Sequence, residues 1–229
     1  MHGNYQRQRR GNTGAILLLI EIFNIGTQFI PPVTLFVTFV NLLMYMDIFN
    51  NLPGIDASCC SYHDIIQSKS YYRLFLCSIT HADDWHLYYN MVSFIYKGTS
   101  LERRINGKRM SVMLILFCII SNIVTIFTYH YLYLLLGIES YKYVCCVGFS
   151  SIIFALQVVI SSMSDTGRLS LYGISLSGLL VILGELFFIW LLSSGSSFIG
   201  HLSGIIVGIL YVTGPLKLVE NSISSLLNF

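Results

Sequence analysis

The stretch Gly148-Phe149-Ser150-Ser151 lies where a polar loop passes into a long apolar run, so that a serine stands near the start of a candidate membrane helix. A second stretch, Gly200-His201-Leu202-Ser203-Gly204, opens the last apolar run of the chain. A serine and a histidine near the starts of two helices can act as a nucleophile and its general base if both helices begin on the same side of the membrane. Whether Ser150 and His201 can meet therefore depends on how the apolar runs are arranged in the membrane.

The composition indicates a membrane protein, because 55% of the residues are hydrophobic and only 10% are charged, whereas soluble domains contain about 25% charged residues. A chain of 229 residues has room for one compact helical bundle. The formal net charge of +2 is too small to indicate a nucleic-acid partner.

Six apolar runs predict an all-α bundle of six membrane-spanning helices, at residues 33–49, 85–101, 110–136, 147–163, 169–192 and 198–212. The apolar patch 15–20 is too short to span and is followed by Glu21, which favours an interfacial helix. Residues 50–80 are polar and mixed, and we expect them to form a long first loop outside the hydrocarbon. The predicted organisation is therefore an N-terminal segment with the interfacial helix (1–32), a membrane domain (33–213) and a short tail (214–229).

Basic residues gather next to alternate ends of these runs, which orients the bundle by the positive-inside rule. They place both termini in the cytosol and the first loop on the lumenal side, so that the second, fourth and sixth spans all begin on the non-cytosolic side. Ser150 and His201 then each lie about three residues inside their spans, roughly 5 Å below that surface. The cytosolic cluster consists of Arg7, Arg9, Arg10, Arg103, Arg104, Lys108, Arg109, Arg168 and Lys217.

A third polar cluster enters the second span from the same side. His86 and Asn90 are four residues apart, so they share one helical face, and both can donate hydrogen bonds. His81 lies in the approach to this helix. A metal site is disfavoured, because Asp83 and Asp84 fall in the turn and an asparagine is a poor ligand for transition metals. We expect no metal and no other cofactor.

Two further features leave alternatives open. The cysteine pairs Cys59-Cys60 and Cys145-Cys146 lack the spacing of a zinc site; they form either a disulfide between two loops, if both face an oxidising lumen, or free thiols. Glu185 lies inside the fifth span, where an acidic residue is either functional or a protonated acid that is hydrogen-bonded to a neighbouring helix.

Taken together, His81-x₄-His86-x₃-Asn90, Gly148-x-Ser150 and His201-x₂-Gly204-x₃-Gly208 resemble the rhomboid family of intramembrane serine proteases in order and spacing. The resemblance extends from the first span to the sixth. The stretches 81–86, 101–104 and 214–217 are most similar to the rhomboid-related branch of the endoplasmic reticulum.

The resemblance implies a catalytic dyad in which Ser150 is the nucleophile and His201 the general base. It also implies an oxyanion hole made by the Ser150 N–H, His86 and Asn90. The structural support that it implies comes from His81, Gly148, Glu102, Arg104, Gly204 and Gly208. Helix N-termini favour developing negative charge, which supports this assignment independently of the resemblance.

Three positions depart from the family pattern. Ser151 replaces the glycine that usually follows the nucleophile, Tyr72-Arg73 replaces Trp-Arg, and Asn106 replaces a glycine, for which asparagine is suited because it tolerates left-handed backbone geometry. Relatives of the reticulum branch carry a long cytosolic tail that binds ubiquitin and an ATPase. This sequence ends at Phe229, so we do not expect those partners.

The predicted function is that of an intramembrane serine endopeptidase. It would act near the lumenal side of the reticulum membrane on membrane-protein substrates with unstable transmembrane helices, which reach it through the lipid bilayer. The alternative is a catalytically inactive rhomboid-like protein that binds or dislocates membrane clients. A small transporter is disfavoured, because the polar residues cluster near one surface instead of lining a path across the midplane.

Overall fold

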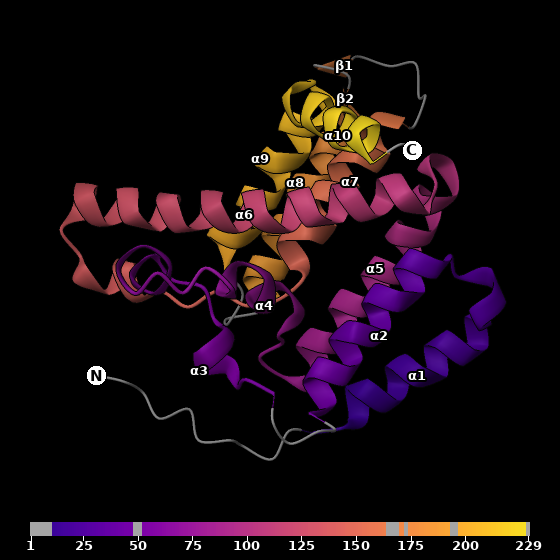
Figure 1. Ribbon diagram of the computed structural model, residues 1–229, viewed down its shortest axis with the longest axis horizontal. Coiled ribbons are helices and arrows are strands. Elements are labelled where there is room, and N and C mark those ends of the chain that lie inside the picture. Colours follow the sequence, from indigo (N-terminus) through magenta and orange to yellow (C-terminus); the bar gives the residue numbers. More distant parts are fainter. Residues whose placement is uncertain (1–10, 48–51, 164–169, 172–173, 193–196, 228–229) are drawn as a thin grey trace.

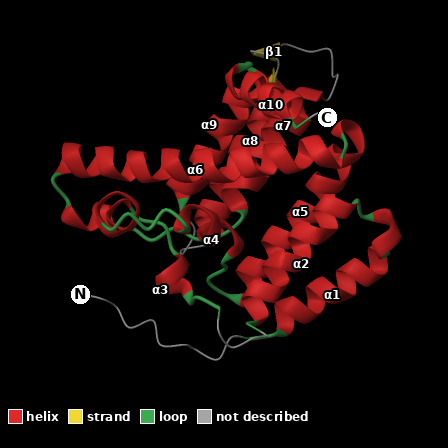
Figure 2. Ribbon diagram, viewed as in Figure 1, coloured by secondary structure: helices red, strands yellow, loops and turns green. Residues whose placement is uncertain are grey.

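The computed structural model describes residues 11–47, 52–163, 170–171, 174–192 and 197–227, and it is a bundle of helices (Figure 1, Figure 2). The long helices are α1 (Thr13–Ile25), α2 (Pro32–Met46), α5 (Asp84–Ile105), α6 (Gly107–Leu136), α7 (Ser150–Met163), α8 (Leu176–Leu192), α9 (Phe198–Val212) and α10 (Pro215–Leu226). The predicted first loop contains α3 (Ile55–Ser58), a π-helical turn (His63–Gln67) and α4 (Arg73–Ile79). Two further short turns are 3₁₀-helical, at Thr27–Phe29 and Glu139–Tyr143. Two-residue strands, β1 (Ser170–Leu171) and β2 (Ile174–Ser175), pair in antiparallel fashion ahead of α8.

Each predicted span overlaps an observed helix, but two of them begin later than predicted. The fourth begins at Ser150 rather than at residue 147, because Gly148 has a φ of +116° that no α-helix allows. The fifth begins at Leu176 rather than at residue 169, because residues 170–171 pair with 174–175 as strands. The sixth has the predicted bounds.

Only some of these helices could cross a bilayer by length and hydropathy alone. Among the described residues, α6 with its 30 residues is the single helix that meets both criteria by itself. The consecutive helices α9 and α10 meet them as a pair, although the chain bends by 69° between them. The apolar helices α1, α2 and α7 and residues 178–191 of α8 are shorter.

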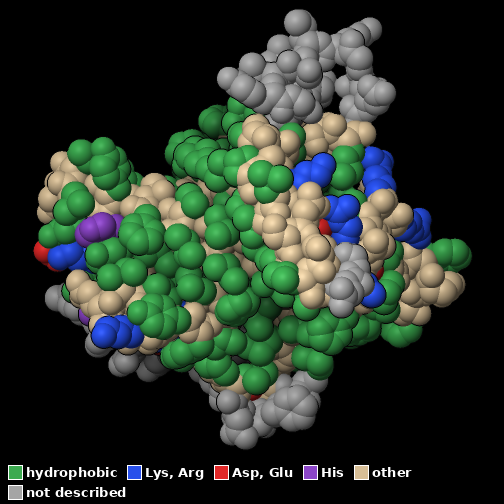
Figure 3. Space-filling model, turned by 45° about the horizontal axis from the view of Figure 1, so that its top comes forward, with side chains coloured by type: hydrophobic (Ala, Val, Ile, Leu, Met, Phe, Trp, Pro, Cys, Tyr) green, Lys and Arg blue, Asp and Glu red, His purple; other side chains and the backbone are tan. Residues whose placement is uncertain are grey.

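The outer surface is largely apolar, as Figure 3 shows for one face of the molecule. Large hydrophobic side chains are exposed on α2, α6 and α8, including Phe36, Leu134 and Phe187. Soluble monomers rarely expose broad apolar patches, whereas a surface that contacts lipid requires them. The apolar exterior therefore fits a protein that is embedded in a membrane.

Helix α1, which the sequence predicts to be interfacial, packs against α5. The Asp84 carboxylate, at the first residue of α5, accepts hydrogen bonds from the N–H groups of Gly14 (2.6 Å) and Ala15 (3.0 Å). Further along, Tyr96 of α5 donates to Glu21 of α1 (2.7 Å). Helix α1 therefore runs beside α5 from Asp84 as far as Tyr96, and the Asp84 carboxylate satisfies free N–H groups at the N-terminus of α1.

The first described helix begins and the last one ends at different ends of the bundle, and the cytosolic placement of both termini stays a prediction. Gly11 lies beside Asp84, at the end of α5 where α7 and α9 begin, whereas α10 lies at the opposite end, against the start of α6. The chain enters α1 and leaves α10 at opposite ends of the bundle. Residues 1–10, with their three arginines, lie outside the described residues.

A second carboxylate of α5 fixes α2 in the same way at the other end of the helix. Glu102 is buried and accepts hydrogen bonds from the N–H groups of Val33 (3.0 Å) and Thr34 (2.8 Å) and from the Thr34 hydroxyl (2.7 Å). Because α5 carries an acid near each of its ends, it holds both N-terminal helices in register along its length.

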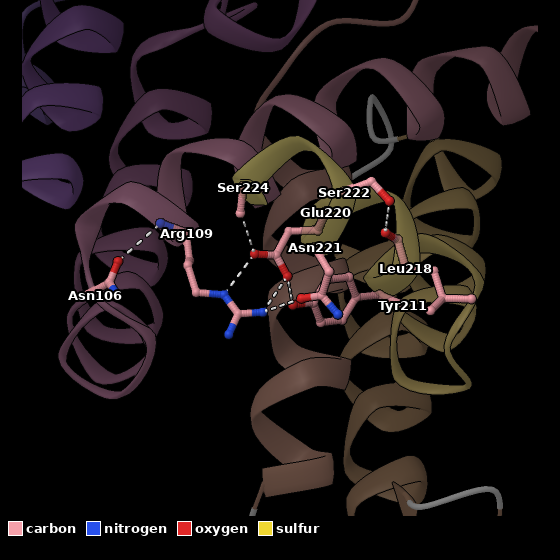
Figure 4. Close-up of polar contacts among 8 residues, drawn as sticks. All are labelled: Asn106, Arg109, Tyr211, Leu218, Glu220, Asn221, Ser222 and Ser224. Atoms are coloured by element: carbon pink, nitrogen blue, oxygen red, sulfur yellow. Dashed lines mark hydrogen bonds and ion pairs between the residues drawn. The ribbon is translucent and has the colours of Figure 1, made fainter. Parts of the chain in front are cut away.

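The segment that the sequence predicts to be a tail forms α10, which is tied to the bundle by a buried carboxylate (Figure 4). Glu220 has no exposed surface. Arg109 of α6 binds both of its oxygens, at 2.8 and 2.7 Å, and the Tyr211 hydroxyl of α9 donates to it at 3.1 Å. A bidentate ion pair of this kind fixes orientation as well as distance.

We expect Arg109→Ala to lower the free energy of unfolding by about 2 kcal/mol, because Glu220 would keep its charge in a buried site without its cation. This loss of stability is smaller than that expected for a fully buried ion pair, because the Arg109 side chain is 36% exposed. Thermal unfolding of the purified protein in detergent measures the change. The control is Lys217→Ala, which removes an exposed cation of α10 and should leave the midpoint unchanged. Equal midpoints for the two variants would contradict this account.

Candidate active site

Ser150 is the first residue of α7, at the end of a loop that is held in place by its backbone. Gly148 has a φ of +116°, and its N–H donates to the Cys77 carbonyl of α4 in the first loop (2.8 Å). The first N–H groups of a helix have no acceptor within the helix, and that of Ser150 is among them. The serine hydroxyl and a free donor are thus presented together at the positive end of a helix dipole.

His86 packs directly over this loop. A β-carbon built on Gly148 would lie only 2.7 Å from both Cε1 and Nε2 of the His86 ring. His86 Nδ1 accepts a hydrogen bond from the Ala82 N–H (3.3 Å), so a neutral ring carries its proton on Nε2. That N–H faces Gly148, two residues before the serine.

Asn90 lies one turn further along the same face of α5. Its buried side chain donates one hydrogen bond to the His86 carbonyl (2.8 Å). One more turn along, the Phe94 ring meets the Phe149 ring, with their centroids 4.7 Å apart. The face that carries His86 and Asn90 therefore lies against the residues that precede Ser150, and the second N–H of the Asn90 amide remains available as a donor.

Two glycines allow α9 to approach α7 closely. A β-carbon on Gly204 would lie 2.0 Å from the Ser151 carbonyl oxygen, and one on Gly208 would lie 2.8 Å from the Ala155 carbonyl oxygen. The backbones of the two helices touch at these points, as small residues allow in membrane bundles. Gly204 is level with Ser151, so His201, three residues earlier, is level with the start of α7.

His201 faces the helix that carries Ser150. Its buried ring lies 4.9 Å from the Phe154 ring, centroid to centroid, and Phe154 shares a face of α7 with Ser150 because it is four residues further on. Among the described residues no hydrogen bond joins the Ser150 hydroxyl to this ring, and Nδ1 has no partner. Catalytic hydrogen bonds are often long before substrate binds, and a dyad needs no carboxylate on Nδ1.

The residues that were predicted to support the site fall into two groups by position, one beside His86 and one at the far end of α5. His81 belongs to the site: it is fully buried, its ring meets the edge of His86 at 5.1 Å, and burial first, then the charge of His86, keep its pKa well below the usual value. Glu102 and exposed Arg104 lie at the far end of α5, where Glu102 caps α2. Their contribution is to hold the helices and not to contact the reacting groups.

Three contacts were not predicted from the sequence. They are the hydrogen bonds that Asp84 accepts from the start of α1, the packing of the Phe154 ring on His201, and the ion pair of Lys97. Lys97 of α5 forms an ion pair with Glu185 of α8 at 3.0 Å. Glu185 therefore binds a neighbouring helix, as one of the two predicted alternatives had it, and its partner there is the Lys97 ammonium group. A lysine inside a predicted span was the signal that could have revealed the pair.

A cavity of about 510 Å³ lies away from this site, beside the second half of α5. Its lining residues are Ile25, Phe29, Ile95, Tyr96, Thr99, Ser100, Arg103 and Arg104. Within the described part of the chain, no three histidine, cysteine, aspartate or glutamate side chains are grouped so as to hold a metal ion.

Gly148→Ala should remove the reactivity of Ser150, because an alanine would be strained at positive φ and would collide with His86. Gly137→Ala is the matched control: it also has a positive φ, of +68°, but no atom lies within 4 Å of the added carbon. We expect Gly137→Ala to cost about 1 kcal/mol of stability and to leave labelling of the serine by a fluorophosphonate intact. Equal labelling of the two variants would show that the reactivity of Ser150 does not depend on the close contact between Gly148 and His86.

Comparison with known proteins shows the family of this chain. The Rhomboid domain family model matches residues 68–217. Human Rhomboid-related protein 4 is 38% identical over 213 residues, which cover 93% of this chain and 67% of the human protein, and the mouse protein of the same name is 37% identical over 218 residues, covering 95% and 68%. Rhomboid-like protein 14, mitochondrial, of Arabidopsis thaliana is 31% identical over 218 residues, covering 91% and 64%. With most of its length matched in this way, and with a largely apolar exterior, the chain belongs to the rhomboid family of multi-pass membrane proteins.

Proposed function

We propose that this protein is an intramembrane serine endopeptidase that uses a dyad of Ser150 and His201. The observation that carries the proposal is the convergence of three helices on the start of α7. The His86 ring packs on Gly148, and the His201 ring of α9 contacts Phe154, which shares a face of α7 with Ser150. A nucleophile, a base and hydrogen-bond donors from three elements are the parts that acyl transfer requires.

The reaction follows from these roles. The Ser150 oxygen attacks the carbonyl carbon of the scissile peptide while its proton passes to Nε2 of His201. The Ser150 N–H, His86 Nε2–H and the free Asn90 N–H stabilise the oxyanion that develops. His201 then gives the proton to the leaving amine, and a water molecule hydrolyses the acyl-enzyme by the reverse sequence of proton transfers.

We further propose that the bundle crosses the membrane six times or more and that the site lies near the lumenal face, in the endoplasmic reticulum. Its substrates would be membrane proteins whose transmembrane helices unwind readily, because only an extended segment can reach the serine. Hydrolysis needs water, which the centre of the bilayer lacks, so a site at the start of a helix is suited to it.

The direct test is to incubate the purified protein in detergent with a single-span reporter protein and to identify the products by mass spectrometry. We expect one cut near the lumenal end of the reporter's helix. The alternative function, an inactive protein that binds membrane clients, draws support from the lack of a hydrogen bond between Ser150 and His201. It would be favoured if the reporter co-purified with the protein and remained intact.

Asn90→Ala should slow cleavage by about 10²-fold, as expected for loss of one oxyanion donor. Its effect on the thermal midpoint should be small, since the lost hydrogen bond is to the carbonyl of its own helix. Asn90→Asp is the matched variant, because it keeps the size of the side chain while replacing the donor with an acceptor. If Asn90→Asp retained full activity, Asn90 would have no role as a donor.

A further inference from the structure

The six cysteines of the chain differ in exposure and in hydrogen-bond partners. All six are free thiols, and only Cys145 is exposed, whereas Cys77 and Cys60 are almost completely buried. Cys60 and Cys77 hydrogen-bond to each other, Cys146 donates to Ser197, and Cys118 donates to Ser78. The remaining two thiols, of Cys59 and Cys145, hydrogen-bond to each other across two loops.

A backbone pairing holds these loops together. Cys60 and Cys146 exchange both of their N–H···O bonds, at 3.1 and 3.2 Å, as an isolated antiparallel bridge. Successive side chains of an extended strand point to opposite faces. Cys59 and Cys145 therefore share the face opposite to that of Cys60 and Cys146, and because the pairing is antiparallel they are diagonal neighbours on it. Their thiols hydrogen-bond across this diagonal.

We propose that Cys59 and Cys145 are a site of oxidative modification that forms a disulfide between the first loop and the loop five residues before Ser150. This inference does not depend on protease activity. The disulfide would link two segments that are 86 residues apart in the sequence, and it would hold the entrance to α7 against α3. The partner that it requires is an external disulfide, either a small molecule or an oxidised dithiol protein.

The two thiols have complementary roles in the exchange. The thiolate of exposed Cys145 attacks one sulfur of the external disulfide and releases the other as a thiol, leaving a mixed disulfide on Cys145. The Cys59 thiolate then attacks the Cys145 sulfur, and the second donor sulfur leaves as a thiol. The external disulfide is reduced by two electrons, the two cysteines are oxidised, and both thiol protons end on the donor. The hydrogen bond from Cys145 to Cys59 lowers the pKa of the Cys59 thiol and raises that of the Cys145 thiol, so the first step is assigned to Cys145 by its exposure and not by its acidity.

The test is to reduce the purified full chain in detergent, remove the reductant, and add glutathione disulfide. We expect the intact mass to fall by about 2 Da, with a protease digest yielding one linked pair of peptides that contain Cys59 and Cys145. Cys118→Ser is the matched control and should form the same link. Cys59→Ser and Cys145→Ser should lose it, and Cys59→Ser should instead retain glutathione on Cys145.

Other outcomes would overturn the proposal. A link through Cys60, Cys77 or Cys146 in the wild-type chain would assign the chemistry to another pair, and glutathione adducts with no internal link would show that the thiols do not meet. Because the peptide map is made on the wild-type chain, the result does not depend on whether a variant folds. A dithiothreitol-dependent fall in the thermal midpoint should be seen for the oxidised wild type and for oxidised Cys118→Ser, but not for Cys59→Ser.

Discussion

Ser150→Ala should abolish both cleavage of a single-span reporter and covalent labelling by a fluorophosphonate. The expected loss of cleavage is on the order of 10³-fold or more, because removal of the nucleophile leaves only the binding and oxyanion contributions to the rate. The substitution removes one oxygen from the first turn of α7 and no hydrogen bond within the described structure. The thermal midpoint should therefore stay close to that of the wild type.

Ser151→Ala is the matched control, since it removes the same atom from the next residue of the same helix. The backbone carbonyl of Ser151 touches Gly204, but its hydroxyl has no role in the proposed reaction. We expect Ser151→Ala to label and to cleave at rates near those of the wild type. If both variants labelled equally, the reactive serine would lie elsewhere and the protease assignment would fail.

Gly204→Ala should have the second largest effect, because it separates the two helices that carry the dyad. The added carbon would lie 2.0 Å from the Ser151 carbonyl oxygen, a backbone atom that can move only with its helix. Overpacking of this kind costs about 1–3 kcal/mol. A displacement of about 1 Å between reacting groups reduces catalysis by about 10²-fold, so activity should fall further than stability.

Gly184→Ala is the matched control, because it makes the same change from glycine to alanine in another helix, α8. No atom lies within 4 Å of a carbon added there, and alanine favours a helix more than glycine does. The thermal midpoint of Gly184→Ala should be unchanged or slightly higher, and its activity unchanged. Full activity of Gly204→Ala would show that the close contact of α7 and α9 does not position His201.

Local patterns in the chain were sufficient to predict most of the helices. The run 198–212 predicted the bounds of α9, and long apolar runs predicted α6 and most of α5. The length of a continuous apolar run can be read directly from the sequence. Asn106 was predicted to tolerate left-handed geometry, and its φ of +69° confirms this. These features depend on residues that are close together in the sequence.

The spatial order of the site could be predicted only through the resemblance of its motifs. Spacing shows that His86 and Asn90 share a helical face, but not that the face meets Gly148 and Phe149. The start of α7 was predicted at residue 147, three residues before its observed start at Ser150, because hydropathy carries no information about the backbone turn at Gly148. Which glycine permits a helix contact is likewise a property of the neighbouring helix.

By itself, then, the sequence determined that this chain is a helical membrane protein with a serine and a histidine near the starts of two helices. Only the tertiary structure decided that α1 runs along α5 from Asp84, that Glu185 is paired with Lys97, and that Cys59 meets Cys145. The physical reason is the same in each case. A carboxylate, a cation or a thiol finds its partner through space, and the partners here lie 69 to 88 residues away in the chain.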